Sequence, residues 1–440
     1  MGFSLSRPTV YRLIGEAIAN RIGPMSKRLG GIGEAFADRN FRIYSIGSVT
    51  SWITYFVQEI AFSWTAWEVT KSTAWLAVVA GLTTLATILF IPVGGVFADR
   101  YDRFTMVRIA YGFDLVKAMI LAILAATNSI TLSIICAAAF AHGLIHSFSI
   151  PASYGMMPRF VAKDRLASCI AVSAAYTQFA VFAGPALAGW LLVHWGIAVA
   201  FLTNVLGYIL YFVTTLFLVT PDGYQQDRAP RQSIRQDILV GISYVASHRG
   251  LSALLLLILA GDSVSSALYR LMPAYSSTVL AGGAGTMSAL YGAAGLGATL
   301  AALWLAHGGA AGATPGRVLW ALLGLAVSAL LLAGSITLAM ALLAMLLFGF
   351  SQETRRTGTV SIMQASVQDS QRGRVLSSLF LFTQVAGGLG TIIVGTSAQA
   401  TGLRLPMLVS GLLVAVVWFI TFGRRETIAA SFARKSGRNQ

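Results

Sequence analysis

The sequence is poor in charge and in cysteine. Only 11% of its 440 residues are charged and 56% are hydrophobic, whereas about 25% of the residues in a soluble domain are charged. A mean hydropathy of +0.73 therefore excludes an ordinary soluble protein. The two cysteines, Cys136 and Cys169, both lie in or at the ends of apolar segments. This excludes a disulfide framework and a cysteine-based metal cluster.

Several chemical signatures are also missing. The sequence contains no Gly-x-x-x-x-Gly-Lys-Ser/Thr loop to cradle a nucleotide phosphate, so ATP does not drive this protein directly. We find no set of Ser, His and Asp on soluble loops and no metal-ligand spacing, and the loops are too short for a catalytic domain. We therefore predict a protein that is not an enzyme and has no catalytic residue, no cofactor and no metal.

Apolar runs of about 20 residues, the length that crosses a bilayer, follow one another along the chain. They predict an all-α membrane protein with twelve transmembrane helices. The expected spans are 43–68, 74–97, 104–126, 130–151, 166–191, 195–219, 251–273, 285–306, 316–333, 336–354, 374–398 and 404–423.

The long polar break at 220–250 divides the spans into halves of six. The expected organisation is a basic cytoplasmic segment, a six-helix bundle, a cytoplasmic central loop, a second six-helix bundle and a basic cytoplasmic tail. These parts cover 1–42, 43–219, 220–250, 251–423 and 424–440.

The net charge of +15 is concentrated in a few segments. Most of the 31 Lys and Arg residues fall in 1–42, in 220–250, in 424–440 and in the loops after the second, fourth and tenth spans. Basic loops stay in the cytoplasm, which predicts a multi-pass protein of the bacterial inner (plasma) membrane with both termini cytoplasmic. Anionic membrane lipid then accounts for the positive charge, and no nucleic-acid partner is needed.

The two halves repeat one another. Gly184, Gly189 and Gly196 in the first half fall at one constant offset on Gly390, Gly395 and Gly402 in the second. The segments that align at this offset are Tyr176-Thr177-Gln178-Phe179-Ala180 and Phe382-Thr383-Gln384-Val385-Ala386. Parallel six-helix repeats are a transporter architecture, with the substrate site at the interface between the repeats.

Four charges crowd the loop between the second and third spans. Its notable residues are Gly95, Asp99, Arg100, Asp102 and Arg103. Asp99 can face a helix N-terminus or a neighbouring arginine. Arg100 and Arg103 can pair with carboxylates across a cytoplasmic cleft. Such pairs can form and break, which suits a gating latch. The alternative is a charged turn that only fixes topology.

This loop also carries a resemblance. Gly95-x-x-x-Asp99-Arg100-x-Asp102-Arg103 resembles the loop between helices 2 and 3 of the major facilitator superfamily, with Asp102 where the general pattern has glycine. That variant is similar to the enterobactin-exporter-like and macrolide-efflux-like branch of the drug:proton antiporters. Gly184-Pro185-Ala186-Leu187-Ala188-Gly189 resembles a looser form of the antiporter motif of exporters. The resemblance implies proton-coupled export by alternating access.

Polar residues inside apolar spans are costly and therefore informative. Asp114 is expected near the bilayer midplane, with Lys117 one turn later on the same helix face. It either titrates a proton or makes a structural pair. His142 and His146, four residues apart, share a helix face. They suit proton coupling because histidine changes charge near neutral pH, or they are simply hydrogen-bonded to neighbouring helices.

Spans 1 and 7 carry further candidates. Glu59 or Asp262 could accept the coupling proton, and Arg270 could hold a carboxylate or catecholate of a substrate. Alternatively, an ion pair between these spans closes an outer gate. Gln178 and Gln384 hold equivalent positions in the repeat and either line the substrate cavity or tie helices together.

These observations lead to one hypothesis and two alternatives. We expect a monomeric secondary active transporter that exports a small amphipathic molecule, a siderophore or a drug-like compound, in exchange for protons. The alternatives are a metabolite uptake permease and a non-transporting membrane scaffold. Replacing Asp99 with asparagine would abolish transport if the loop is a latch, but would leave the partner binding of a scaffold intact.

Overall fold

The computed structural model describes residues 31–162, 164–218, 243, 249–307, 314–367 and 369–423, and these residues are predominantly helical. The helices are α2 (Gly31–Ala37), α3 (Arg39–Thr70), α4 (Thr73–Arg100), α5 (Arg103–Ala126), α6 (Leu132–Tyr154), α7 (Leu166–His194), α8 (Gly196–Leu216), α10 (Arg249–Arg270), α11 (Met272–Thr278), α12 (Ala284–His307), α13 (Pro315–Gly334), α14 (Leu338–Ser366), α15 (Asp369–Thr401) and α16 (Arg404–Phe422). A short 3₁₀ helix, η1 (Met157–Arg159), follows α6.

The long helices agree with the predicted spans, and the all-α membrane fold is confirmed. Ten of them contain a window apolar enough to cross a membrane, among the described residues. The two remaining long helices are α3 and α14. They are less apolar because they carry interior polar residues, Glu59 on α3 and Gln352 and Arg355 on α14.

Side-chain caps fix where several helices begin. Asp102, for example, accepts a hydrogen bond from the backbone N–H of Thr105 at 2.8 Å and so starts α5. Such caps satisfy backbone donors that have no partner inside the helix. The other capping residues of this kind are Asp38, Ser72, Thr131, Thr314 and Thr337. The turns between the long helices are therefore encoded locally.

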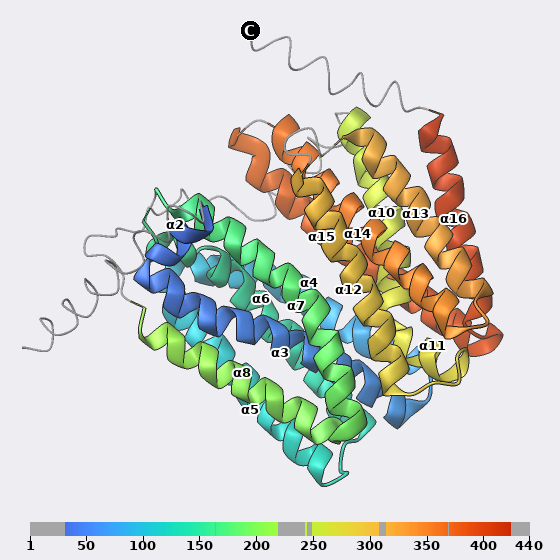
Figure 1. Ribbon diagram of the computed structural model, residues 1–440, viewed down its shortest axis with the longest axis horizontal. Helices are drawn as coiled ribbons and strands as arrows, with labels where there is room; N and C mark the ends of the chain where they lie inside the picture. The colour runs from blue at the N-terminus through green and yellow to red at the C-terminus, as the bar shows by residue number, and fades with distance from the viewer. Residues whose placement is uncertain are drawn as a thin grey trace, which may run out of the picture.

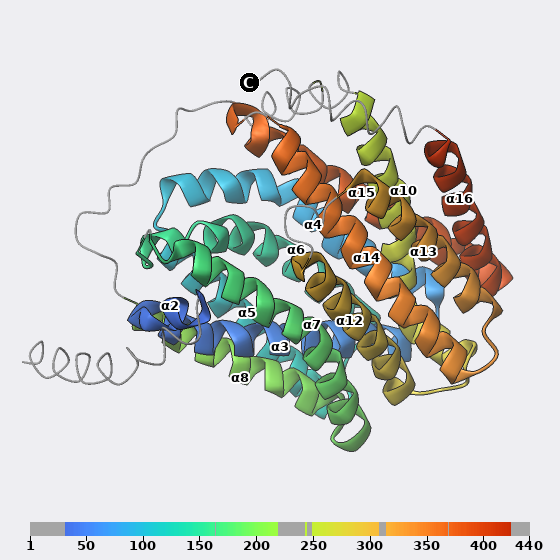
Figure 2. The same cartoon turned by 45° about the horizontal axis from the view of Figure 1, so that its top comes forward.

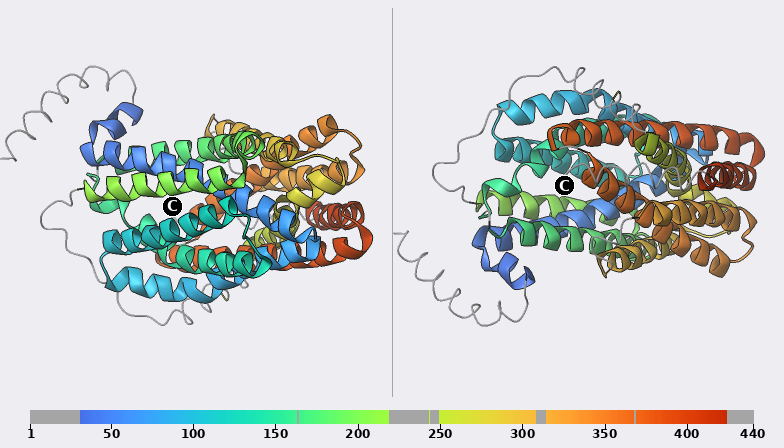
Figure 3. Two further views of the ribbon diagram at one scale, coloured as in Figure 1. Left: turned by 90° about the horizontal axis from the view of Figure 1, so that it is seen from below. Right: turned by 90° about the horizontal axis from the view of Figure 1, so that it is seen from above.

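The long helices form two groups, α3 to α8 and α10 to α16 (Figure 1). In the first group α3 packs on α7 and α8, α4 on α6, and α5 on α6 and α8. In the second, α10 packs on α15 and α16, α12 on α14, and α13 on α14 and α16. The same packing partners thus recur in the same order, and Figures 2 and 3 show the two groups from other directions.

The repeat predicted from the glycines has a structural counterpart. Gly196 and Gly402 both adopt a left-handed backbone, with φ of 80° and 75°, in the turn after α7 and after α15. Both positions therefore require glycine or a strained residue. Gly184 packs against Phe56 of α3, and Gly390 packs against Ser263 of α10, the helix equivalent to α3.

The two groups meet at one end of the molecule. There α7 packs on α12, and α4 packs on α15 (Figure 1). The Ser72 hydroxyl donates a hydrogen bond to Gln399 across this contact at 2.8 Å. Gly189 lies against Ser288, and Gly395 lies against Ala77, so small residues allow the close approach. From this end the ribbons of the two groups diverge toward the end that carries α2 and the basic loop after α4 (Figure 1).

Several expected boundaries differ from the structure. The tenth span does not end at residue 354, because α14 continues to Ser366. Arg355 was expected in a cytoplasmic loop, but it is buried inside α14 with 1% of its surface exposed. The first span begins earlier than expected, at Arg39. Most of 220–250, all of 424–440 and residues 1–30 lie outside the described residues.

Candidate functional site

Four charged or titratable side chains meet inside the first helix group, and we call them the N-terminal cluster: Glu59, Asp114, Lys117 and His142. The Lys117 ammonium donates a short hydrogen bond to Asp114 and lies 2.9 Å from Nδ1 of His142. His142 Nε2 lies 3.6 Å from Glu59 Oε1. Three helices, α3, α5 and α6, therefore contribute to one connected system of charges.

Aromatic rings hold this cluster in place. His146 stacks on Tyr55 with ring centroids 6.3 Å apart and an interplanar angle of 16°. The rings of His142 and His146 are 5.8 Å apart, as expected from their shared helix face. Glycine at 143 lets α6 approach α4 closely, since a Cβ there would lie 2.2 Å from the Thr83 carbonyl oxygen. The position of His142 is thus fixed by its neighbours on α3 and α4.

A cavity of about 50 Å³ lies beside the N-terminal cluster. Its polar lining includes Glu59, Lys117 and His142 from the first group and Tyr269 and Arg270 from the second. A cavity of this size holds a few water molecules. The N-terminal cluster is therefore connected to the interface between the two helix groups.

The members of the cluster differ in access to this cavity. Glu59 lines it with 37% of its side chain exposed, whereas the Asp114 side chain is 10% exposed. Gln58, beside Glu59, also lines it and is buried, and its Oε1 atom has no hydrogen-bond partner. Glu59 is thus the carboxylate of the cluster that reaches the space between the groups.

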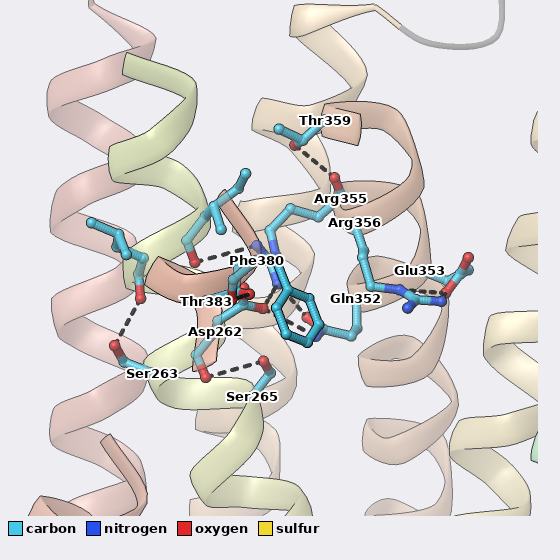
Figure 4. Close-up of polar contacts among 12 residues, drawn as sticks. Asp262, Ser263, Ser265, Gln352, Glu353, Arg355, Arg356, Thr359, Phe380 and Thr383 are labelled. Carbon is cyan, nitrogen blue, oxygen red and sulfur yellow. Dashed lines mark hydrogen bonds and ion pairs between the residues drawn. The ribbon is translucent and has the colours of Figure 1, made fainter. Parts of the chain in front are cut away.

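A second charged cluster lies in the second helix group, and we call it the C-terminal cluster: Asp262, Gln352 and Arg355. The Arg355 guanidinium donates a short hydrogen bond to Asp262 and a 2.8 Å hydrogen bond to Gln352 Oε1. Figure 4 shows Asp262 of α10 and Arg355 of α14 pointing toward one another. Gly261 leaves room for the guanidinium, because a Cβ there would lie 2.6 Å from Arg355 Nε.

A separate ion pair within α14 lies apart from the C-terminal cluster. Arg356 Nη2 lies 3.1 Å from Glu353 Oε2, and the Arg356 side chain is largely exposed (Figure 4). Asp262 and Arg355 are both largely buried. The pair of Asp262 and Arg355 therefore experiences the lower dielectric and depends more strongly on its partner.

An ion pair between spans 1 and 7, the alternative role for these charges, is not present in the part of the chain that the structure describes. Glu59 has His142 as its ion-pair partner, and Asp262 has Arg355. Arg270 shares the cavity with Glu59 but makes no ion pair with it. Glu59 and Asp262 are thus each paired within their own helix group.

The charged loop after α4 is held within the first group. Asp102 caps α5, and its Oδ1 atom lies 3.5 Å from Nη1 of Arg159. Arg159 lies in η1, in the basic loop after the fourth span, and is 6% exposed. Arg103 donates to the Ala98 carbonyl oxygen, and Arg100 is exposed in the last turn of α4. The aspartate that replaces the usual glycine therefore has a structural role of its own.

This geometry leads to a prediction for Asp102. Replacing Asp102 with alanine removes the cap of α5 and the partner of Arg159, and we expect unfolding to become easier by about 0.5–2 kcal/mol. Asparagine keeps the cap and removes only the charge, so D102N separates the two contributions. Thermal unfolding of the protein in detergent measures both. Equal stability of D102A and the unmodified protein would contradict this reading.

The remaining candidates are dispersed. Gln178 of α7 and Gln384 of α15 are half-buried, and neither lines the cavity of the N-terminal cluster. Pro185 lies inside α7 and is buried there. Gly95 lies near the end of α4, and a Cβ at this position would meet no other atom within 4 Å. Asp99 lies in α4, and its side chain is outside the described part of the structure.

Sequence reasoning missed Arg355 and the environment of His142. The sequence is compatible with a helix that continues past residue 354, provided that its charged side chains face the protein interior. Lys117 was recognised as a partner of Asp114, but its contact with His142 joins residues of different helices. Within the described residues, no group of three His, Cys, Asp or Glu side chains forms a metal site.

Two helix groups that repeat the same packing form the architecture of the major facilitator superfamily transporters. The sequence matches the transmembrane secretion effector family over residues 34–435. The chain belongs to this family, and the resemblance carried by its charged loop is confirmed.

Curated relatives cover part of the chain. Macrolide efflux protein A of Streptococcus pyogenes is 25% identical over 228 residues, which are 51% of this chain and 56% of that protein. Macrolide efflux protein A of Enterococcus faecalis is 25% identical over 171 residues, 38% of this chain and 52% of that protein. The matches thus span about half the length of these relatives.

Solved structures share the fold at low sequence identity. A bacterial homologue of the human lysosomal transporter Spinster, inward-facing and occupied, has a TM-score of 0.69 at 13% identity, covering 90% of this chain and 97% of that one. A POT family transporter in complex with a thioalcohol-conjugated peptide has a TM-score of 0.70 at 12% identity, covering 89% and 96%.

Proposed function

We propose that this protein is a secondary active transporter that exports a small amphipathic molecule across the bacterial inner membrane in exchange for protons. The observation that carries the proposal is the N-terminal cluster, in which buried Asp114 and Lys117 connect through His142 to Glu59 in a cavity between the helix groups. Buried ionisable residues in membrane helices mark ion pathways and proton relays. Both termini face the cytoplasm, and the protein acts as a monomer in contact with membrane lipid.

The export direction is supported by the family description and by the names of the relatives. Two macrolide efflux proteins match about half of their length to this chain. They favour a drug-like substrate over a siderophore, which only the resemblance of the charged loop supports. Uptake of a metabolite is the alternative within transport, and a scaffold without transport is the alternative outside it.

Transport in sealed vesicles tests this proposal. The purified protein is reconstituted into liposomes, an outward or inward pH gradient is imposed, and movement of a radiolabelled macrolide and of a ferric or iron-free siderophore is followed. We expect one of these compounds to move in the direction opposite to proton flow, and we expect a protonophore to abolish this movement. Movement in the same direction as protons would favour uptake, and no gradient-dependent movement of any compound would contradict the proposal.

Alternating access makes a separate prediction at the end where the helix groups meet. Gly395 packs against α4 so closely that a Cβ would lie 2.4 Å from the Ala77 Cβ and 2.9 Å from the Thr73 carbonyl oxygen. Replacing Gly395 with valine should therefore push α15 away from α4. It should favour a conformation in which the two helix groups are separated at this end.

Disulfide cross-linking measures this shift. Ser72 and Gln399 are hydrogen-bonded across the contact at 2.8 Å, so S72C/Q399C should cross-link when Cys136 and Cys169 are replaced by serine. We expect G395V to lower the cross-linking rate several-fold. Gly292 is the matched control, because a Cβ there meets no other atom within 4 Å. An unchanged rate in G395V would show that this contact does not open.

A further inference from the structure

The two ring nitrogens of His142 face opposite charges. Nδ1 lies 2.9 Å from the Lys117 ammonium, and Nε2 lies 3.6 Å from the Glu59 carboxylate. His142 is thus placed between a buried cation and the carboxylate that reaches the cavity.

The lysine determines where the imidazole carries its proton. An ammonium has three donors and no acceptor, so Nδ1 of His142 must accept a hydrogen bond from Lys117. A neutral imidazole with an accepting Nδ1 carries its proton on Nε2. The Nε2–H group therefore points toward Glu59.

The same contact disfavours an N–H group at Nδ1. An imidazolium has N–H donors at both nitrogens, and its Nδ1–H would face the donors of the Lys117 ammonium. Lys117 is itself held in place by Asp114 in a buried pair. The ammonium therefore keeps its place beside Nδ1, and Nε2 is the nitrogen that faces Glu59.

The other groups around His142 include a second carboxylate, Asp114, whose Oδ1 lies 3.7 Å from Nδ1. From α3, His142 faces Tyr55 and Glu59, and from α5 it faces Asp114 and Lys117. On its own helix it faces the ring of His146. The helix α4 packs against α6 through the hydroxyl groups of Thr83 and Thr87, which do not titrate, and Arg270 of α10 lines the same cavity.

We infer that Glu59 is the group that takes up the coupling proton, and that His142 is a positioning residue whose Nε2–H is aimed at Glu59 by Lys117. This inference rests on the proposed function, since it assigns roles within proton-coupled transport. At 3.6 Å the contact with His142 is longer than a hydrogen bond. Glu59 is therefore free to exchange its proton with the cavity while His142 orients its ionised form.

Amide replacements separate positioning from proton transfer. A glutamine at 142 provides an N–H near the Nε2 position but cannot be protonated, whereas alanine provides neither. We expect H142Q to keep proton-coupled transport within about threefold of the unmodified protein and the same pH profile. We expect H142A to lose more transport than H142Q, because no N–H group then faces the Glu59 carboxylate. E59Q should lose the response to the pH gradient but still exchange substrate.

Two outcomes overturn these roles. If H142Q loses its response to the pH gradient while E59Q keeps it, His142 carries the proton. If the unmodified protein shows no response to a pH gradient, the proposed function fails and the role of Glu59 fails with it. The tautomer of His142 is still decided by a measurement that does not depend on transport.

Nitrogen-15 NMR of histidine-labelled protein makes this measurement. The chain contains five histidines, and the signals that disappear in H142Q belong to His142. We expect the shifts of a ring that is protonated at Nε2 and accepts a hydrogen bond at Nδ1. The shifts of an imidazolium, or of a ring protonated at Nδ1, would overturn the inference.

Discussion

Replacing Arg355 with glutamine is expected to destabilise the protein by about 3–5 kcal/mol, because it leaves the Asp262 carboxylate without its cation in a largely buried site. The side chain of Asp262 has little exposure to water, so solvent cannot replace the lost partner. A single change in a helix of the second group should thus cost a large fraction of the total stability.

The double variant D262N/R355Q is the control for this prediction. It removes both charges and keeps hydrogen-bonding groups of similar size, so we expect it to recover most of the stability lost in R355Q. The free energy of unfolding in mixed detergent micelles measures all three variants. If R355Q and D262N/R355Q were equally destabilised, the loss would come from packing around Arg355 and not from the ion pair.

Removing Lys117 should have a smaller effect than removing Arg355, because Asp114 has a second basic neighbour. Nδ1 of His142 lies 3.7 Å from Asp114 Oδ1, and in K117M this nitrogen is released from the ammonium. The imidazole can then take a proton and replace the missing cation, at pH values where histidine titrates. We expect K117M to fold and to lose less stability than R355Q.

The variant K117M/H142Q tests this explanation. An amide cannot be protonated, so Asp114 then lacks any cation, and the loss should reach about 3–5 kcal/mol. D114N/K117M serves as the matched control without a buried charge and should be more stable than K117M. A K117M/H142Q protein as stable as K117M would show that His142 does not compensate for the lysine.

The two clusters illustrate how far the sequence could be interpreted before the structure. Asp114 and Lys117 are three residues apart on one helix, and helical geometry alone brings such residues together. Asp262 and Arg355 are 93 residues apart in the sequence and lie on different helices. Hydrophobic periodicity shows which face of a helix is buried, but it does not show which neighbouring helix that face meets.

The position of Arg355 was predicted wrongly for a related reason. Charged residues at the end of an apolar run are usually assigned to water, and that rule placed Arg355 in a loop. In the structure α14 continues through these residues because Asp262 and Gln352 provide the partners that water would otherwise supply. The energy of a buried charge is decided by its partner and not by its local sequence.

The sequence by itself determined the twelve long helices, their caps and the repeat of the two halves. These features depend on local properties: run length sets a span, a side chain at the first turn sets its start, and only glycine readily adopts the left-handed turns at Gly196 and Gly402.

Only the tertiary structure decided which charges meet, and hence which residues are candidates for coupling. The contact of Lys117 with His142, the approach of His142 to Glu59 and the opening of Glu59 into a cavity shared with Arg270 each join different helices. Their physical cause is the rotation and neighbour of each helix in the bundle, which residues far along the chain determine together.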